Sequence, residues 1–205
     1  MVTYSERVAN AGVDKFSRRR EELATSALET LAERGYANTG LRDIAQRSEF
    51  SHGVLHYYFQ DKNDLIQHCV RQYKSECATQ YDDIVATSQT ADELDERFCA
   101  AMADTLRDEA SMHRLWYDLR NQSMFQAELT PVIQEIDGLL ERMIWTIVTR
   151  YAELRGRDPV VDSPLAYAMY DGMFEQALGA FLTGDLSALD AVAANCGRIL
   201  RLIVP

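Results

Sequence analysis

Apolar residues recur every three to four positions along most of the chain, which is the spacing of an α-helix that buries one face. Alternating runs of β-branched and aromatic residues, which would indicate strands, are nearly absent. The pattern predicts helices over residues 17–34, 41–47, 52–58, 62–87, 91–109, 112–125, 128–155, 163–183 and 186–203. The fold class is therefore predicted to be all-α.

Two of the predicted helices, over residues 41–47 and 52–58, are too short to bury much surface by themselves. A short break separates them, and longer helices precede and follow them, which is the arrangement of a helix-turn-helix. Ser51 is placed to cap the second short helix, and Asp61 with Asp64 forms a capping-box-like start for the next helix. The second helix of such a pair enters the DNA major groove with its N-terminal residues first.

The pattern divides the chain into a flexible N-terminal arm over residues 1–15, a three-helix DNA-binding domain over residues 16–65, and a larger helical domain over residues 66–205. The last two predicted helices are joined by only a few residues, so we expect them to fold back as an antiparallel hairpin. Both helices carry more apolar residues than one buried face needs, which indicates a further contact.

The chain has a net charge of −11, because 32 Asp and Glu residues outnumber 21 Lys and Arg residues. Residues 1–65 hold nine basic and ten acidic residues, so the negative charge lies almost wholly in residues 66–205. A nearly neutral module binds DNA when its cations share one face, so the charge does not exclude nucleic acid. Arg18, Arg19 and Arg20 form a basic cluster that either contacts phosphates or lies on a solvated face.

No apolar run approaches the roughly 20 residues of a membrane span, and the N-terminus lacks the apolar stretch of a secretory signal. We therefore expect a cytoplasmic protein without a membrane partner. The four cysteines (Cys69, Cys77, Cys99 and Cys196) form no CxxC pair and are expected to be free thiols in the core.

Catalytic motifs are missing from the sequence. His52 and His56 have the i, i+4 spacing of metal ligands, but no HExxH motif or carboxylate partner accompanies them. Neither a glycine-rich phosphate loop nor a serine nucleophile elbow occurs. We therefore expect no enzyme activity, no metal site and no cofactor.

Three segments together resemble the DNA-binding signature of the TetR family of transcriptional regulators: Gly35 to Ala45, Ser51 to Phe59, and Asp61 to Leu65. The resemblance covers about residues 16–70 and is specific, because residue types, order and spacing all agree. It implies that the chain binds double-stranded DNA at a pseudo-palindromic operator. The DNA-binding residues that it implies are Thr39, Arg42, Ser51, His52, Gly53, Val54, His56, Tyr57 and Lys62.

Three positions depart from the family pattern. Gly40 replaces the Ser or Thr that usually caps the second helix, and glycine supplies no hydroxyl. Glu49 takes a turn position that is usually Gly, where a left-handed conformation costs about 1 kcal/mol. His56 replaces the usual first tyrosine, which makes DNA affinity sensitive to pH in this interpretation. Together they weaken DNA binding or indicate an unusual operator.

The remaining residues match the family only in length and architecture, and the resemblance implies a cavity for a small-molecule effector. Trp116 and Arg120 share a helical face and would suit an apolar ligand with an acidic or polar end. The alternative is ordinary core packing, with Arg120 paired to Asp171. The predicted ligand-binding residues are Phe98, Met102, Trp116, Tyr117, Arg120, Phe125, Tyr167, Tyr170 and Phe174.

In the family, the last two helices form a homodimer through a four-helix bundle. The interface residues predicted on this basis are Met169, Gly172, Leu189, Val192, Cys196, Ile199, Leu200 and Ile203. The function implied is a sequence-specific repressor that a small-molecule ligand releases from its operator. A helix-turn-helix protein without an effector, controlled by a partner instead, is the alternative.

Overall fold

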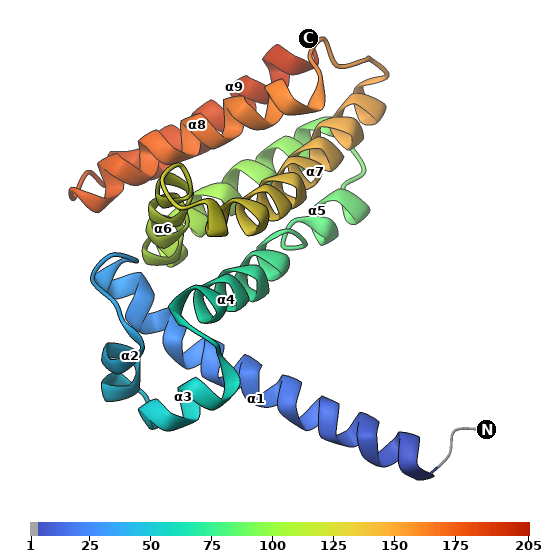
Figure 1. Ribbon diagram of the computed structural model, residues 1–205. Helices are drawn as coiled ribbons and strands as arrows, with labels where there is room; N and C mark the ends of the chain where they lie inside the picture. The colour runs from blue at the N-terminus through green and yellow to red at the C-terminus, as the bar shows by residue number, and fades with distance from the viewer. Residues whose placement is uncertain (1–3) are drawn as a thin grey trace. The chain divides into compact units, whose positions relative to one another are not determined.

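The structure is a computed structural model that describes the backbone of residues 4–205 and the side chains of residues 15–75 and 77–205. Over this range the regular elements are all helical, so the all-α prediction is confirmed (Figure 1). The elements are α1 (Tyr4–Arg34), α2 (Leu41–Arg47), α3 (His52–Tyr58), α4 (Lys62–Cys77), α5 (Asp82–Thr87), α6 (Ala91–Ser123), the 3-10 helix η1 (Ala127–Leu129), α7 (Thr130–Arg155), α8 (Ser163–Leu182) and α9 (Ser187–Ile203).

Several predicted helix ends differ from the observed ones. The helix expected to reach Thr87 ends at Cys77, because the chain turns there and α5 follows separately. The helices expected over 91–109 and 112–125 form the single helix α6, which bends at Glu109 where φ is −122° and ψ is 18°. Helix α1 begins at Tyr4 rather than near residue 17, and residues 1–3 of the predicted arm lie outside the described residues.

The described residues fall into two compact units. The first unit contains residues up to 73 together with residues 118–132, and the second contains residues 74–117 and 133–205. Helix α6 therefore contributes its first 27 residues to the second unit and its end to the first. Among the described residues, no helix is both long and apolar enough to cross a membrane.

The first unit is built around apolar side chains from α1 to α4. Helices α2 and α3 have seven residues each and pack against each other and against α1. The side chains of this core are fully or almost fully buried: Leu23, Ala27, Leu31, Ile44, Leu55, Phe59, Leu65 and Ile66. Because short helices are marginal alone, this burial is what stabilises the pair.

Side chains cap the short helices much as the sequence predicts. The Ser51 Oγ accepts a hydrogen bond of 3.3 Å from the Val54 N–H, and the Asp61 Oδ1 accepts one of 2.9 Å from the Asp64 N–H. Gly40 has no side chain to offer, but the Asp43 Oδ2 accepts a bond of 2.9 Å from the Gly40 N–H. The caps at Ser51 and Asp61 are confirmed, and Asp43 compensates for Gly40.

Residues 118–132 join the first unit through polar contacts with the turn after α1. Gly35 ends that helix with a φ of +77°, a left-handed conformation that glycine adopts readily. The following Tyr36 N–H donates to the Asp118 Oδ2 at 2.7 Å, and the Tyr36 hydroxyl contacts the side chains of Asn63 and Gln126. Tyr36 thus connects the turn before α2 to the end of α6.

The second unit has a core of α6 and α7 with the α8–α9 hairpin, whose two helices lie side by side (Figure 1). The Tyr170 hydroxyl of α8 donates to the Cys196 carbonyl of α9 at 3.1 Å. All four cysteines are buried thiols rather than halves of a disulfide. Helix α9 faces this core with its apolar side, which includes Val192, Leu200 and Ile203, each with no exposed surface.

This packing covers part of the predicted dimer interface. Val192, Cys196, Leu200 and Ile203 are fully buried inside their own chain and Ile199 is 8% exposed, so they have almost no surface for a second copy. The sequence shows that these positions are apolar, but only the packing of α9 decides which surface they meet. Met169, Gly172 and Leu189 keep partly exposed surface, and their role stays a prediction.

Gly197 allows a close approach between α6 and α9. A Cβ atom at this position would lie 2.6 Å from the Asp95 Oδ1 and 3.1 Å from the Arg201 guanidinium nitrogens. Asp95 and Arg201 form an ion pair beside Gly197, and the Cys99 thiol donates to Asp95 at 3.1 Å. A methyl group at residue 197 therefore fits only if the Asp95 and Arg201 side chains shift.

Gly197→Ala is therefore expected to lower the free energy of unfolding by about 1–2 kcal/mol, because overpacking displaces the ion pair. Gly138→Ala is the matched control in α7, where a Cβ would make ordinary contact at 3.4 Å with Arg142. That control should raise the free energy of unfolding by about 0.5–1 kcal/mol through helix propensity. Urea denaturation of both variants measures the difference, and equal stabilisation by both would contradict the packing argument.

Candidate functional site

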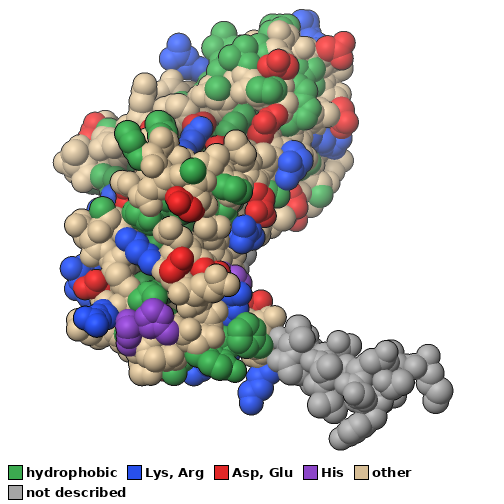
Figure 2. Space-filling model, in the orientation of Figure 1, with side chains coloured by type: hydrophobic (Ala, Val, Ile, Leu, Met, Phe, Trp, Pro, Cys, Tyr) green, Lys and Arg blue, Asp and Glu red, His purple; other side chains and the backbone are tan. Residues whose placement is uncertain are grey.

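Helix α3 presents a polar and aromatic surface to solvent. Ser51, Gly53, His56 and Tyr57 are exposed, whereas Leu55 is fully buried. His52 and Val54 are half-buried beside them. Figure 2 shows histidine side chains next to Lys and Arg side chains on the surface over α2 and α3. Six of the nine predicted DNA-binding residues thus lie together on one short helix and its cap.

Aromatic contacts order this surface. The rings of His52 and His56 meet edge to face with centroids 4.4 Å apart, one helical turn from each other. The Tyr57 ring is 73% exposed, and its centroid lies 6.3 Å from that of Phe16 and 4.9 Å from that of Tyr58. Among the described residues, no group of three or more metal-binding side chains is gathered. The two histidines thus lie on the outer surface of α3, and their contact with DNA stays a prediction.

The basic residues near α3 differ in their exposure and in the contacts that they already make. Arg42 is exposed at the start of α2. Arg47 pairs with Glu33 at 2.6 Å, and the Arg19 guanidinium lies 4.5 Å from the centroid of the Phe50 ring. Arg20 pairs with Asp64 at 2.8 Å, so within the basic cluster of α1 this side chain has a structural contact.

Thr39 and Lys62 make internal contacts rather than pointing freely to solvent. Thr39 is only 2% exposed, and its hydroxyl donates to the Gly35 carbonyl at 2.8 Å. The Lys62 Nζ donates to the Tyr36 carbonyl at 2.5 Å and lies 3.9 Å from the centroid of the Tyr36 ring. Burial lowers the pKa of Lys62. Both residues hold the turn before α2, and their contact with DNA stays a prediction.

Glu49 lies in the bend between α2 and α3 and is exposed. Among the described residues only glycines have positive φ, so Glu49 does not adopt the left-handed conformation considered from the sequence. The turn therefore accommodates glutamate without that strain. What remains is its negative charge between the two helices.

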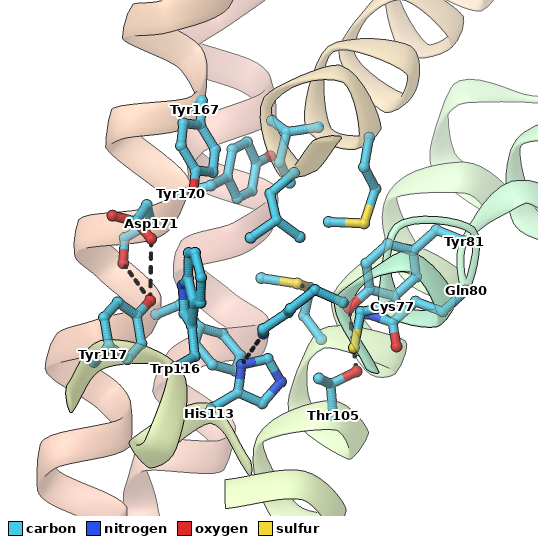
Figure 3. Close-up of a pocket in the computed structure, with 16 residues that line it drawn as sticks. Cys77, Gln80, Tyr81, Thr105, His113, Trp116, Tyr117, Tyr167, Tyr170 and Asp171 are labelled. Atoms are coloured by element: carbon cyan, nitrogen blue, oxygen red, sulfur yellow. Dashed lines mark hydrogen bonds between the residues drawn. The ribbon is translucent and has the colours of Figure 1, made fainter. Parts of the chain in front are cut away.

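The second unit contains a cavity lined by residues that are far apart in the sequence. Figure 3 shows the labelled side chains converging on it from α4, the segment after α4, α6 and α8, and α7 supplies further lining. It leaves about 60 Å³ for the centres of water-sized molecules, which is room for a few waters. The lining residues are Lys74, Cys77, Gln80, Tyr81, Met102, Thr105, His113, Trp116, Tyr117, Leu140, Met143, Ile144, Tyr167, Tyr170, Asp171 and Phe174.

Polar contacts cross the cavity wall at three places. The Lys74 Nζ lies 3.3 Å from the His113 Nδ1, and both side chains are buried. The Tyr117 hydroxyl donates to the Asp171 Oδ1 at 3.2 Å, and Tyr81 and Thr105 share a hydrogen bond of 3.1 Å between their hydroxyls. These hydrogen bonds fix polar groups in a largely apolar surround, which is typical of ligand sites.

Burial shifts the ionisation of the cavity residues. It lowers the pKa of Lys74, and it lowers the pKa of His113 well below its usual range, with the nearby Lys74 charge adding to the effect. Burial also raises the pKa of the Tyr81 and Tyr170 hydroxyls. The cavity thus disfavours charge on its own side chains, because a low-dielectric surround stabilises ions poorly.

Of the nine predicted ligand-binding residues, the structure brings six to this cavity: Met102, Trp116, Tyr117, Tyr167, Tyr170 and Phe174. Phe98 is fully buried behind it, with its ring centroid 5.1 Å from that of Tyr81. Arg120 belongs to the first unit, and Phe125 is 87% exposed, so neither lines the cavity. Which of these residues contact a ligand stays a prediction.

Sequence analysis missed Lys74, the one lysine of the cavity lining. A signal was available, because Lys74 falls on the apolar face of its helix, four residues after Val70 and three before Cys77. A charged residue in an apolar stripe is rarely buried without a function or a partner. Gln80, Tyr81 and Thr105 had no comparable signal.

Comparisons with known proteins show what the chain resembles. The family model for "Bacterial regulatory proteins, tetR family" matches residues 23–69. The HTH-type transcriptional regulator BetI of Burkholderia ambifaria is 29% identical over 113 residues, which are 54% of this chain and 58% of that relative. The chain thus spans a little over half the length of this curated relative.

Solved structures share the fold over nearly the whole chain. A TetR transcription regulator from Haloarcula marismortui has a TM-score of 0.74 at 15% identity, covering 92% of this chain and 100% of that chain. FadR of Bacillus subtilis in complex with stearoyl-CoA has a TM-score of 0.67 at 21% identity, covering 90% of this chain and 97% of that chain. At these identities, the likeness shows the arrangement of helices.

The buried His113 predicts a pH dependence of stability. Its pKa lies well below the usual 6.5, so the unfolded chain binds a proton at this residue that the folded chain does not. Stability is then lost as pH falls below about 6.5, by up to about 1.4 kcal/mol per pH unit for one proton. Urea denaturation between pH 7.5 and 5 measures how the free energy of unfolding changes with pH. In His113→Gln this change should be smaller by the contribution of one proton. An unchanged slope in the variant would contradict the burial of a neutral imidazole.

Proposed function

We propose that the chain is a member of the TetR family of bacterial regulatory proteins and acts as a DNA-binding transcriptional repressor that a small molecule releases. The observation that carries this proposal is the exposed face of α3, held by buried Leu55 and Phe59 between capped helices. A recognition helix needs this combination, because it must be rigid while its outer side chains reach base edges.

We assign different roles to the exposed residues of this surface. Val54 and Gly53 lie near the start of α3, where a small side chain and a bare backbone allow close approach to a thymine methyl group and the bases. Tyr57, His56 and Arg42 are exposed and polar, which suits contacts with phosphate and sugar. Two copies of the chain would read the two halves of a pseudo-palindromic operator.

The cavity of the second unit supports control by a ligand. It is lined mostly by aromatic and apolar side chains with a few fixed polar groups, which is how proteins hold small molecules. FadR of Bacillus subtilis, a protein with the same fold, was solved with stearoyl-CoA, so this architecture accommodates effectors. This observation favours an effector-controlled regulator over a helix-turn-helix protein without one.

Helix α6 offers a route by which a ligand changes DNA binding. Trp116 and Tyr117 line the cavity, and the next residue, Asp118, accepts the hydrogen bond from the Tyr36 N–H. Tyr36 precedes α2 and is held by Lys62 of α4. A ligand that moves Trp116 would therefore shift the contact that positions the turn before the DNA-binding helices. Such coupling between sites is typically worth 1–3 kcal/mol.

Footprinting of the DNA that flanks the gene, with the purified chain at low salt, tests the proposed function. We expect a protected site with twofold symmetry and loss of protection when an extract of cellular metabolites is added. Absence of any protected site would overturn DNA binding. Protection that no metabolite fraction changes would instead favour a regulator without an effector.

Arg42→Ala is expected to weaken binding to all DNA sequences alike, because this exposed side chain is assigned to a phosphate. The slope of the logarithm of the binding constant against the logarithm of salt concentration should fall by about 0.9 per protomer. Arg107→Ala is the control, since Arg107 pairs with Asp104 and Asp108 on α6, in the second unit. A changed sequence preference with an unchanged salt slope would contradict the role given to Arg42.

Asp118→Ala is expected to weaken DNA binding although Asp118 is not on the DNA-binding face, because the Tyr36 N–H loses its acceptor. We expect the affinity for DNA to fall about tenfold. A charge-assisted hydrogen bond contributes about 1.5–3 kcal/mol, and only part of this free energy affects DNA binding. The Tyr36 amide should also exchange its hydrogen faster. Asp104→Ala changes an exposed carboxylate on the same helix and should do neither. Equal DNA affinity of both variants would exclude this route.

A further inference from the structure

The cavity of the second unit contains a buried amine. Lys74 is only 1% exposed, although lysine is among the residues least often buried. Its Nζ lies 3.3 Å from the His113 Nδ1 and 5.4 Å from the centroid of the Trp116 ring. Three side chains from α4 and α6 thus form one polar corner in a wall that is otherwise mostly apolar.

Trp116 adds a second hydrogen-bond donor to the cavity lining. Its side chain is 2% exposed, and among the described residues its buried Nε1 has no hydrogen-bond acceptor. Buried donors without an acceptor are rare in folded proteins, because the group gives up its bond to water for nothing in return. A ligand that supplies an acceptor would satisfy the indole N–H.

The rest of the cavity wall is apolar and aromatic. Leu140, Met143 and Ile144 of α7 lie on one side, and Tyr170 and Phe174 of α8 lie on another. The space is small, with about 60 Å³ for the centres of water-sized molecules, so a ring enters only if flexible wall side chains such as Met143 shift. Such a wall suits a compact, flat apolar group, because aromatic and methionine side chains pack well on a ring.

The cavity also contains one carboxylate, but hydrogen bonds engage it. The Asp171 Oδ1 accepts from the Tyr117 hydroxyl at 3.2 Å, and the Asp171 carbonyl accepts from the same hydroxyl at 3.3 Å. Figure 3 shows Tyr117 and Asp171 facing each other on the α6 and α8 sides of the cavity. A cationic ligand would have to displace these hydrogen bonds to reach the carboxylate, which disfavours it.

We propose that this cavity binds a small carboxylic acid with a flat apolar body, whose carboxylate accepts hydrogen bonds from Lys74 and from the Trp116 indole. The proposal names the chemical class of the effector and, for its role in regulation, rests on the proposed function. The apolar body lies against the α7 and α8 walls. The acid is recognised by charge at one end and by shape at the other.

Ionisation gives this binding a signature of its own. Burial lowers the pKa of Lys74, which is faced by Cys77 of its own helix, Glu109 and His113 of α6, and Asp171 of α8. An entering carboxylate stabilises the ammonium form, so the complex takes up a proton when the free amine is neutral. A ligand held by shape alone would not cause this uptake.

Calorimetry with the full chain and without DNA tests the proposal. The probes are benzoate, phenylacetate and 3-phenylpropionate, each with the amide and the amine of the same shape. We expect at least one acid to bind at least tenfold more tightly than its amide and its amine. The heat of binding should be measured in buffers of different ionisation enthalpy over a series of pH values, and it should show proton uptake where the free amine is neutral.

Variants locate the acid in the cavity. Lys74→Met keeps the length of the side chain and should weaken binding of the acid by roughly 10- to 100-fold, with no proton uptake and little change for the amide. Trp116→Phe should weaken it by severalfold. Lys15→Met, which changes an exposed lysine of α1, is the matched control and should bind like the unchanged chain. Circular dichroism confirms folding, and the proton uptake of the unchanged chain provides a test without any variant.

Equal affinity for acid and amide, or no binding of any acid, would overturn the proposal. If an amine binds more tightly than the acid of the same shape, the cavity instead binds a cation at Asp171. If phenylalanine binds more tightly than 3-phenylpropionate, the ligand is instead a zwitterion. The two proposals fail separately. Acid binding without a DNA footprint would support the acid site and contradict the proposed function. A DNA footprint without acid binding would support the proposed function and contradict the acid site.

Discussion

Helices α2 and α3 depend on burial that they cannot provide themselves. Each has seven residues, fewer than an isolated helix needs for stability in water. Ile44 and Leu55 are fully buried in the core of the first unit, and Ser51 and Asp43 supply the caps. Because the inner side chains hold the pair, the outer side chains of α3 are free to serve recognition.

The turn before α2 is under a second constraint. Tyr36 donates its N–H to Asp118 and accepts from Lys62 at its carbonyl, so α4 and the end of α6 hold the same short turn. Helix α6 carries cavity residues immediately before Asp118. One continuous helix therefore connects the place where a ligand would bind to the place that positions the DNA-binding pair.

The cavity combines features that are costly for folding alone. A lysine and a histidine are buried side by side, and an indole N–H lacks an acceptor among the described residues. Apolar residues of similar size would stabilise such a core better, since buried charge and unsatisfied donors oppose folding. Polar groups retained at such a cost are more typical of a binding site than of a structural core.

The sequence by itself determined the helical class, the ends of α2 and α3, and the caps at Ser51 and Asp61, because these depend on local periodicity and on side chains a few residues apart. It also indicated the family, since the resemblance lies in consecutive residues. It did not show that the helix expected to reach Thr87 ends at Cys77. Apolar residues continue beyond Cys77, so their spacing alone does not mark the turn, and tertiary packing decides where the helix ends.

Only the tertiary structure decided which apolar residues face a core, a cavity or solvent. Val192 and Leu200 resemble interface residues in the sequence but are buried in their own chain, whereas Phe125 resembles a ligand contact and is exposed. Periodicity identifies the apolar face of a helix but not what covers it. Lys74 and His113 are 39 positions apart, so only the packing of α4 against α6 brings the amine and the imidazole together.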